Sequence, residues 1–232
     1  MAARVSIAFL LYPGVTQLDL TGPAQVLSRI GAKLDLVWKD RDPVPTDAGF
    51  SILPTATFAE VPRADILCVP GGMGIAGVME DEAAMAWVRS VGLEAQWVTS
   101  VCTGSLILGA AGLLRGYRAA THWAWREHLP LFGAEAVAER VVFDRNRVTG
   151  GGVTAGIDFA LALTARLKGE DFAKAVQLSL EYDPAPPFDA GSPEGAGEAL
   201  VQAYSARMAK LASDRGERIA RAAEAVHNRY CE

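Results

Sequence analysis

The chain has 232 residues, half of them hydrophobic and 21% charged, which is enough to bury a sizeable core without disulfides or metal ions. Its formal net charge of −5 at pH 7 provides no general attraction to DNA, RNA or an anionic membrane, so no nucleic-acid partner is predicted. The longest apolar run near the N-terminus, residues 7–11, is too short to span a membrane, and no signal-peptide pattern precedes it, so we expect a cytoplasmic protein with no membrane partner.

The predicted elements begin with a strand that is buried on both faces, because residues 4–11 are almost continuously apolar. A turn at Tyr12-Pro13-Gly14 follows it, and Thr21-Gly22-Pro23 is typical of a helix start with an early proline. The next predictions are a strand at 34–38, a peripheral hairpin at 52–58 and a short buried strand at 66–69.

The middle of the chain continues this alternation. Ala84, Trp87, Val88 and Val91 are spaced as on one face of a helix, which predicts an amphipathic helix over 81–92. A strand at 97–101 and a nearly all-apolar, buried helix at 103–114 follow. The remaining predictions are a strand at 119–122, a helix at 125–132, a hairpin at 140–149, and helices at 156–168 and 171–180.

Short buried strands that alternate with helices predict an α/β fold, in which a doubly wound, mostly parallel sheet is flanked by helices. We find no internal repeat or linker, so we expect a single α/β domain over residues 1–232. A Pro/Gly-rich segment at 183–197 leads to one appended C-terminal helix at 198–229, with Gly216 as a point where it could bend.

The strongest candidate for chemistry is Cys102, at the junction of a strand and a helix. Ligands of parallel sheets bind at the carboxyl ends of strands, and Thr103, Gly104 and Ser105 are small enough for a sharp turn there. This is the arrangement of a nucleophile elbow, where the start of a helix lowers a thiol pKa and its amides hold a developing anion. The alternative is a buried cysteine that acts only as a small hydrophobic residue.

The other cysteines are not candidates. Three cysteines at wide spacing predict reduced thiols and neither a disulfide framework nor a zinc site. Cys68 lies inside an apolar strand and is predicted to be core, and Cys231 lies next to the end of the chain. His, Cys and carboxylate residues are nowhere spaced as metal ligands, so no metal is predicted.

Asp19 and His122 are the candidate acid–base residues. Asp19 is expected in the loop after the first strand, where apolar neighbours would disfavour its charged form and let it donate or shuttle a proton near neutral pH. A solvated loop aspartate or a helix cap is the alternative for Asp19. His122, at a strand end, is either a packed, hydrogen-bonded side chain or a catalytic base.

Glycine runs follow two of the strands. Gly72-Met73-Gly74-Ile75-Ala76-Gly77 has the spacing of a dinucleotide-binding fingerprint, but Pro70 precedes it and we expect the next helix only near residue 81. The following strand also ends in Val101-Cys102 instead of the acidic residue that would hold a ribose.

We therefore predict a different role for the backbone amides that follow these strands. The amides of Gly72, Met73 and Thr103 are expected to donate to an oxyanion beside Cys102. The run 150–152 either brings backbone close to Cys102 or serves tight packing.

Five segments, in order across residues 5–165, carry a family resemblance. They are Leu18-Asp19-Leu20-Thr21-Gly22-Pro23, Val69-Pro70-Gly71-Gly72, Val98-Thr99-Ser100-Val101-Cys102-Thr103-Gly104-Ser105, Thr121-His122-Trp123 and Thr149-Gly150-Gly151-Gly152-Val153-Thr154-Ala155-Gly156-Ile157-Asp158. Together they resemble the ThiJ/PfpI superfamily. The tail over 177–193 makes the chain most similar to its isocyanide-hydrating members.

The resemblance implies a class I glutamine amidotransferase-like, flavodoxin-like fold, a homodimer, and no metal or organic cofactor. It implies that Cys102 is the nucleophile, that Asp19 is its acidic partner, and that the Thr103 hydroxyl orients Asp19 or water. The implied reaction is hydration of an isocyanide substrate to an N-substituted formamide through a covalent thioimidate. The residues that could line the pocket are His122, Trp123, Gly152 and Val153.

Two other functions remain open. Many superfamily members have His after the cysteine and Glu as the acidic partner, so Thr103 and Asp19 disfavour an enzyme of reactive carbonyls such as methylglyoxal. A ligand or redox sensor related to the N-terminal domains of AraC-type regulators is the other alternative. Such regulators carry helix-turn-helix units, whereas the arginines expected on the last helix alternate with acidic residues and predict a solvated face; they are Arg207, Arg215, Arg218, Arg221 and Arg229.

Overall fold

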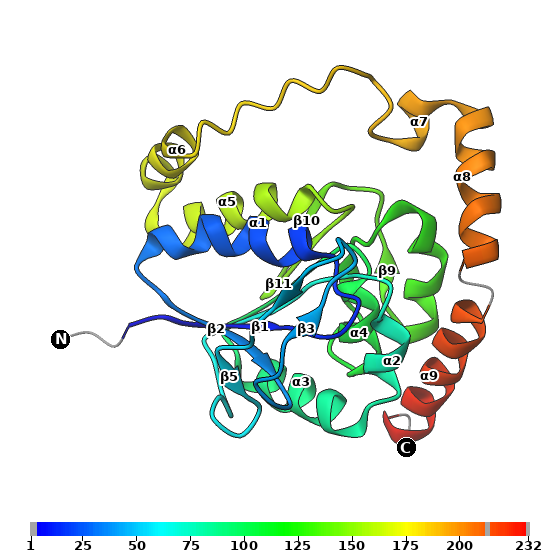
Figure 1. The fold of residues 1–232 in the computed structure, drawn as a ribbon, viewed down its shortest axis with the longest axis horizontal. Helices are drawn as coiled ribbons and strands as arrows, with labels where there is room; N and C mark the ends of the chain where they lie inside the picture. Colours follow the sequence, from blue (N-terminus) through cyan, green and yellow to red (C-terminus); the bar gives the residue numbers. More distant parts are fainter. Residues whose placement is uncertain (1–3, 212–213, 231–232) are drawn as a thin grey trace.

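A computed structural model describes residues 4–211 and 214–230, with a seven-stranded sheet at the centre (Figure 1). The strand order is β10-β11-β7-β6-β1-β2-β5, and all neighbours are parallel except the β10–β11 hairpin. This sheet confirms the predicted doubly wound α/β fold. The strands are β1 (Ser6–Leu10), β2 (Lys33–Trp38), β5 (Ala56–Thr57), β6 (Ile66–Val69), β7 (Trp97–Val101), β10 (Val141–Asp144) and β11 (Arg147–Gly150).

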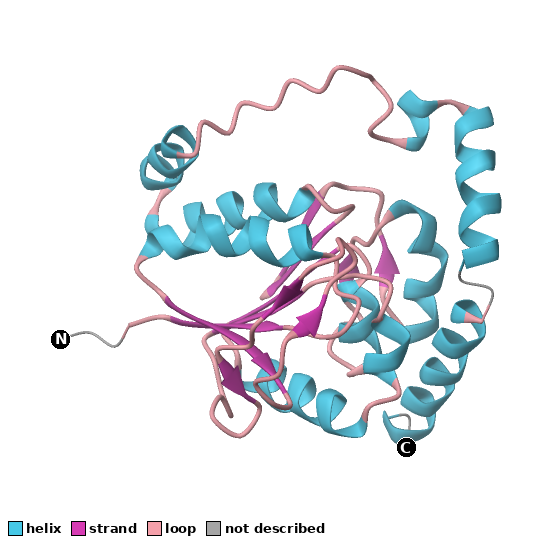
Figure 2. Ribbon diagram, in the orientation of Figure 1, coloured by secondary structure: helices cyan, strands magenta, loops and turns pink. Residues whose placement is uncertain are grey.

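Helices cover both faces of the sheet. In Figure 2 the strands lie between two sets of helices. One face carries α1 (Gln17–Leu27), α5 (Ala155–Lys168) and α6 (Glu170–Ser179), which pack in that order. The other face carries α2 (Ile75–Met79), α3 (Glu82–Glu94) and α4 (Gly104–Ala110). The carboxyl ends of β1, β6 and β7 therefore meet where α1, α2 and α4 begin.

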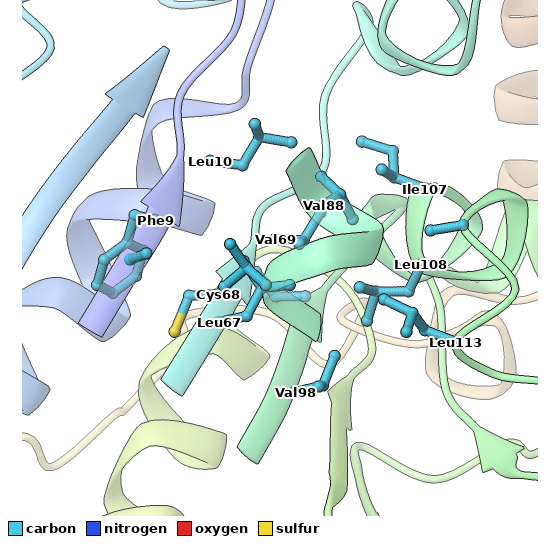
Figure 3. Close-up of a cluster of buried hydrophobic side chains, with 14 of the residues drawn as sticks. Phe9, Leu10, Leu67, Cys68, Val69, Val88, Val98, Ile107, Leu108 and Leu113 are labelled. Carbon is cyan, nitrogen blue, oxygen red and sulfur yellow. The ribbon is translucent and has the colours of Figure 1, made fainter. Parts of the chain in front are cut away.

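The core lies between the sheet and the apolar faces of the helices that cover it. Figure 3 shows Leu67 and Val98 of the sheet in one cluster with Val88 of α3 and Ile107 of α4. Cys68 belongs to this core, as expected, with 2% of its surface exposed. Burial raises the pKa of the Cys68 thiol to about 12, so that it stays neutral.

Three local predictions differ from the structure. Helix α1 begins at Gln17, before Thr21, so Asp19 lies in the first helical turn and not in a loop. No hairpin forms at 52–58, because β4 (Ser51–Ile52) pairs with β3 (Val44–Pro45) and β5 extends the main sheet beside β2. The short helix α2 opens within the glycine run, at Ile75, earlier than the helix start expected near residue 81.

The C-terminal part consists of two helices where one was expected. They are α8 (Glu198–Leu211) and α9 (Arg215–Tyr230), preceded by the short α7 (Pro193–Ala196). In the described ranges, no helix combines the length and apolar character that spanning a membrane requires. Cys231 lies outside the described residues. The remaining short elements are η1 (Ser28–Ile30), β8 (Arg118–Ala119), η2 (Trp123–Phe132) and β9 (Glu135–Ala136).

Candidate active site

Cys102 occupies a strained turn between β7 and α4. Its φ of 56° places a non-glycine residue in the left-handed region, which costs about 1–2 kcal/mol. The neighbouring Gly104 makes the turn feasible, because a Cβ there would lie 2.1 Å from the carbonyl oxygen of Val69. The predicted sharp turn from strand to helix is therefore present.

Hydrogen bonds from three directions fix this backbone. The amide of Cys102 donates to the carbonyl oxygens of Gly150, at 3.1 Å, and Gly151, at 2.7 Å. Its own carbonyl accepts from the hydroxyls of Thr121, at 2.9 Å, and Ser105, at 3.2 Å. The glycine run after β11 thus does bring backbone against Cys102, as one of the two interpretations of its sequence anticipated.

The sulfur of Cys102 is enclosed and its residue is only 6% exposed. Burial raises the pKa of this thiol well above its ordinary value, and the nearby charge of Asp19 raises it further. Hydrogen bonds from the amide and the hydroxyl of Thr103 oppose that shift by favouring the thiolate. The resting group is a neutral thiol, which needs a proton acceptor to become a nucleophile.

Asp19 is that neighbouring acceptor, and it is 1% exposed. Burial raises the pKa of this carboxyl from 3.8 to about 7, although hydrogen bonds from Gly71 and Cys102 partly oppose the shift. Its Oδ2 accepts from the amide of Gly71 at 2.9 Å, whereas its buried Oδ1 has no hydrogen-bond partner. A carboxyl of this kind can take up or release a proton near neutral pH.

The loop after β6 holds Asp19 and Thr103 together. A Cβ at Gly71 would lie 2.6 Å from the Thr103 amide nitrogen and 2.8 Å from Asp19 Oδ2, so only glycine leaves room here. The amide of Gly72, predicted as an oxyanion donor, donates to the Thr103 hydroxyl at 3.1 Å. The carbonyl oxygen of Met73, also predicted at the site, accepts a hydrogen bond from Arg215 at 2.9 Å.

The predicted pocket residues lie on the side of β11 and η2. His122 caps η2, with its Nδ1 accepting from the Ala124 amide at 3.3 Å, and burial lowers its pKa, which keeps the ring neutral. Its ring borders Gly152 and lies 5.6 Å from the ring centre of Trp123. Val153 is partly buried beside them. The described hydrogen bonds of His122 fit the packed interpretation of this side chain.

The sequence did not indicate three further residues near Cys102. The buried Tyr12, predicted only as part of a turn, donates to the Pro70 carbonyl at 2.9 Å. Burial raises its pKa, and the charges of Asp19 and Cys102 raise it further. Tyr204 of α8 and Arg215 of α9 are the other two. The interpretation of Arg215 as part of a solvated face is wrong, because this residue is 6% exposed.

The raised pKa of Asp19 predicts how stability depends on pH. The folded state keeps a proton that the unfolded state releases above about pH 4, so this group stabilises the fold fully only at lower pH, and the contribution is lost as pH rises through about 7. Asp19→Asn, which cannot titrate, should gain stability over the wild type between these limits, by up to roughly 4 kcal/mol. Urea unfolding of both proteins at several pH values measures the difference, and a difference independent of pH would contradict the shift.

Three comparisons connect this geometry to known proteins. The chain is 52% identical to an isonitrile hydratase from Pseudomonas putida over 97% of this chain and 99% of that protein. It is 30% identical to the HTH-type transcriptional regulator GbdR from Pseudomonas aeruginosa over 77% of this chain but only 51% of that protein. The crystal structure of a ThiJ/PfpI family protein from Pseudomonas syringae is similar with a TM-score of 0.87 and 44% identity, covering 95% of this chain and 91% of that one.

A profile of the DJ-1/PfpI family matches residues 5–166, the range that contains Asp19, the Gly71–Gly72 loop and the Cys102 elbow. This match covers more than half of the chain and agrees with the resemblance of the motifs. The chain therefore belongs to the DJ-1/PfpI family.

Proposed function

We propose that this chain hydrates isocyanides to N-substituted formamides, with Cys102 as the nucleophile and Asp19 as the proton carrier. The observation that carries the proposal is the enclosed thiol of Cys102 beside a buried carboxyl whose pKa is about 7. The 52% identity to an isonitrile hydratase over nearly the whole chain supports the same reaction. An isocyanide is neutral, and its terminal carbon must receive both a nucleophile and a proton.

In the first step, the ionised carboxyl of Asp19 takes the proton of the Cys102 thiol and passes it to the terminal carbon while the sulfur attacks that carbon. A C–S bond and a C–H bond form, and the carbon–nitrogen triple bond becomes a double bond. The product is a thioimidate whose carbon carries both the sulfur and the proton of the thiol. The amide and hydroxyl of Thr103 stabilise the sulfur while it carries charge, which agrees with their lowering of the thiol pKa.

In the second step, water adds to the thioimidate carbon, and the C–S bond breaks to return the thiol and release the formamide. Asp19 mediates the proton transfers, and we assign the Thr103 hydroxyl to orienting Asp19 or the water. The amides of Gly72 and Met73 are proposed as further donors, although that of Gly72 donates to Thr103 in this structure. The scheme uses no metal or organic cofactor.

The pocket that we propose for the substrate is bordered by His122, Trp123, Gly152 and Val153. The neutral His122 ring and the backbone of Gly152 lie against each other beside the glycine run that holds the Cys102 amide. Uncharged surroundings of this kind suit a neutral substrate.

Loss of the thiol should abolish the reaction. Cys102→Ala removes the nucleophile and should lower formamide production by at least about a thousandfold, whereas Cys102→Ser keeps the shape with a poorer nucleophile and should also be inactive. Cys68→Ala, which removes the other described thiol, should retain the activity. Formamide formed from a simple alkyl or aryl isocyanide is measured by chromatography, beside a methylglyoxal control. Full formamide production by Cys102→Ala would refute the covalent scheme.

We also propose a cytoplasmic homodimer. The free thiols of Cys68 and Cys102 suit a reducing compartment. Large apolar side chains are exposed from α6 to α8: Leu178 of α6 at 82%, Phe188 of the connecting segment at 78%, and Leu200 of α8 at 54%. The segment between α6 and α7 runs outside the two helix layers (Figure 1), where a second copy of the chain could cover these side chains.

The proposed dimer predicts a molar mass of twice 24.6 kDa in light scattering after size-exclusion chromatography. The double variant Leu178→Asp, Phe188→Asp places charges on the exposed apolar side chains and should shift the protein to one chain per particle. Leu93→Asp on α3, where Leu93 is 62% exposed, is the matched control and should leave the dimer intact. A wild-type protein that runs as a single chain would refute the dimer.

A further inference from the structure

The two C-terminal helices lie outside the part of the chain that the family profile matches, residues 5–166, yet they reach the active site. Helix α9 packs on α2, α4 and η2, and Figure 1 shows it alongside α2. An ion pair between Arg218 Nε and Glu80 Oε1, at 2.7 Å, joins α9 to the end of α2. The helix that follows the Cys102 elbow therefore packs directly against this C-terminal extension.

Arg215, the first residue of α9, is the main contact between the extension and the site. Its Nη2 donates to the Met73 carbonyl oxygen at 2.9 Å and lies 3.0 Å from the Met73 sulfur. Its guanidinium lies 5.1 Å from the ring centre of Trp125, a favourable cation–π distance. Met73 directly follows the glycines whose amides donate to Asp19 and Thr103, so Arg215 braces the loop that holds these two residues.

Burial of the Arg215 guanidinium lowers the stability of the fold unless strong partners compensate for the lost hydration. Within the described ranges, Arg215 makes no ion pair, and a carbonyl and a thioether are weaker partners for a buried cation than a carboxylate. Burial lowers the pKa of Arg215. Four titratable groups surround it, namely Tyr12, Asp214, Arg218 and Cys102. Negative charge on Tyr12, Asp214 or Cys102 favours the positive charge of the guanidinium, whereas the charge of Arg218 disfavours it. A cation held in this position favours negative charge on the Cys102 side.

Tyr204 of α8 approaches from the other side of the site. Its ring centre lies 5.1 Å from that of Trp123 and 6.1 Å from that of His122. Together with Trp123, Leu200 and Val201, it lines a largely apolar cavity of about 250 Å³. Burial raises the pKa of Tyr204, and charge on Cys102 raises it further. Contacts also connect this ring to the thiol: its neighbour His122 borders Gly152, and the preceding Gly151 carbonyl accepts from the Cys102 amide.

We propose that α8 and α9 complete the active site, with Arg215 as a positioning residue for the Met73 loop and the Trp123–Tyr204 cavity as the binding site for an apolar alkyl or aryl substituent. The second half of this inference rests on the proposed function, because the substituent is that of an isocyanide. The first half concerns the environment of Cys102 and holds for any reaction of that thiol.

The role of Arg215 is tested by alkylating Cys102 with iodoacetamide across a pH series and identifying the modified peptide by mass spectrometry. Arg215→Gln should slow alkylation about tenfold near neutral pH and shift its pH profile upward, because the loop is released and the thiolate loses a nearby cation. Arg215→Lys should restore the pH profile but not kcat for an isocyanide, since an ammonium keeps the charge without the planar donors.

Arg221→Gln is the matched control, because Arg221 lies on the same helix with its side chain 62% exposed, and it should behave as the wild type. Unchanged alkylation and unchanged kcat in Arg215→Gln would overturn the proposal. If Arg215→Gln does not fold, the same two measurements on Arg215→Lys decide, and wild-type values for both would overturn it. Because alkylation needs no isocyanide, failure of the proposed reaction and failure of the Arg215 role remain distinguishable.

The cavity is tested with two reagents that differ by one ring, iodoacetanilide and iodoacetamide. Tyr204→Ala should reduce the preference of Cys102 for the aryl reagent about tenfold, since one apolar contact surface is lost, and Tyr204→Phe should preserve it. The KM for cyclohexyl isocyanide should rise in Tyr204→Ala while that for methyl isocyanide stays nearly constant. Equal effects on both reagents would overturn this part, and an effect on the reagents without any isocyanide turnover would refute only the reaction.

Discussion

The contact between the buried Asp19 carboxyl and the buried Cys102 thiol governs the chemistry of this protein. Each group is an acid whose charged form is disfavoured by burial, and the charge of Asp19 further disfavours the thiolate. The pair therefore avoids carrying two negative charges and retains a proton that can move between them. A neutral substrate whose single carbon takes up both sulfur and proton uses both members of the pair at once.

The fold maintains this pair at a measurable cost. Cys102 has a left-handed backbone, and Asp19 has a buried carboxyl oxygen without a partner, two features that destabilise a folded chain. Both are held by groups at the carboxyl ends of β6 and β11, the two parallel strands that flank β7: the Gly71 amide after β6, and the Gly150 and Gly151 carbonyls at the end of β11. The parallel sheet thus brings segments that are distant in the sequence to one edge, where together they hold the strained backbone of Cys102 and the buried carboxyl of Asp19.

Sequence patterns predicted those features that depend on local composition. Continuous apolar runs predicted the buried parallel strands, and small residues after β7 predicted the turn at Cys102. The start of α1 was missed because Pro23 suggested an early helix position, although it lies inside the helix. The two-residue strands β4 and β5 pair with β3 and β2, which both lie outside residues 52–58, so no period-two pattern within that segment can identify their partners.

Arg215 shows most clearly where local patterns stop being informative. Along the sequence it is one of several arginines that alternate with acidic residues, and only docking against Met73, 142 residues away, separates it from the exposed Arg221. The family profile ends at residue 166, so the elbow and the carboxyl lie inside the matched range, whereas Tyr204 and Arg215 lie outside it. If α8 and α9 act as we propose, the matched range supplies the nucleophile and the proton, while these two helices adjust the surroundings of the thiol and the space beside it. Under this proposal, a substitution at Tyr204 changes the space beside the thiol, whereas a substitution at Arg215 also reaches the loop that holds Asp19 and Thr103.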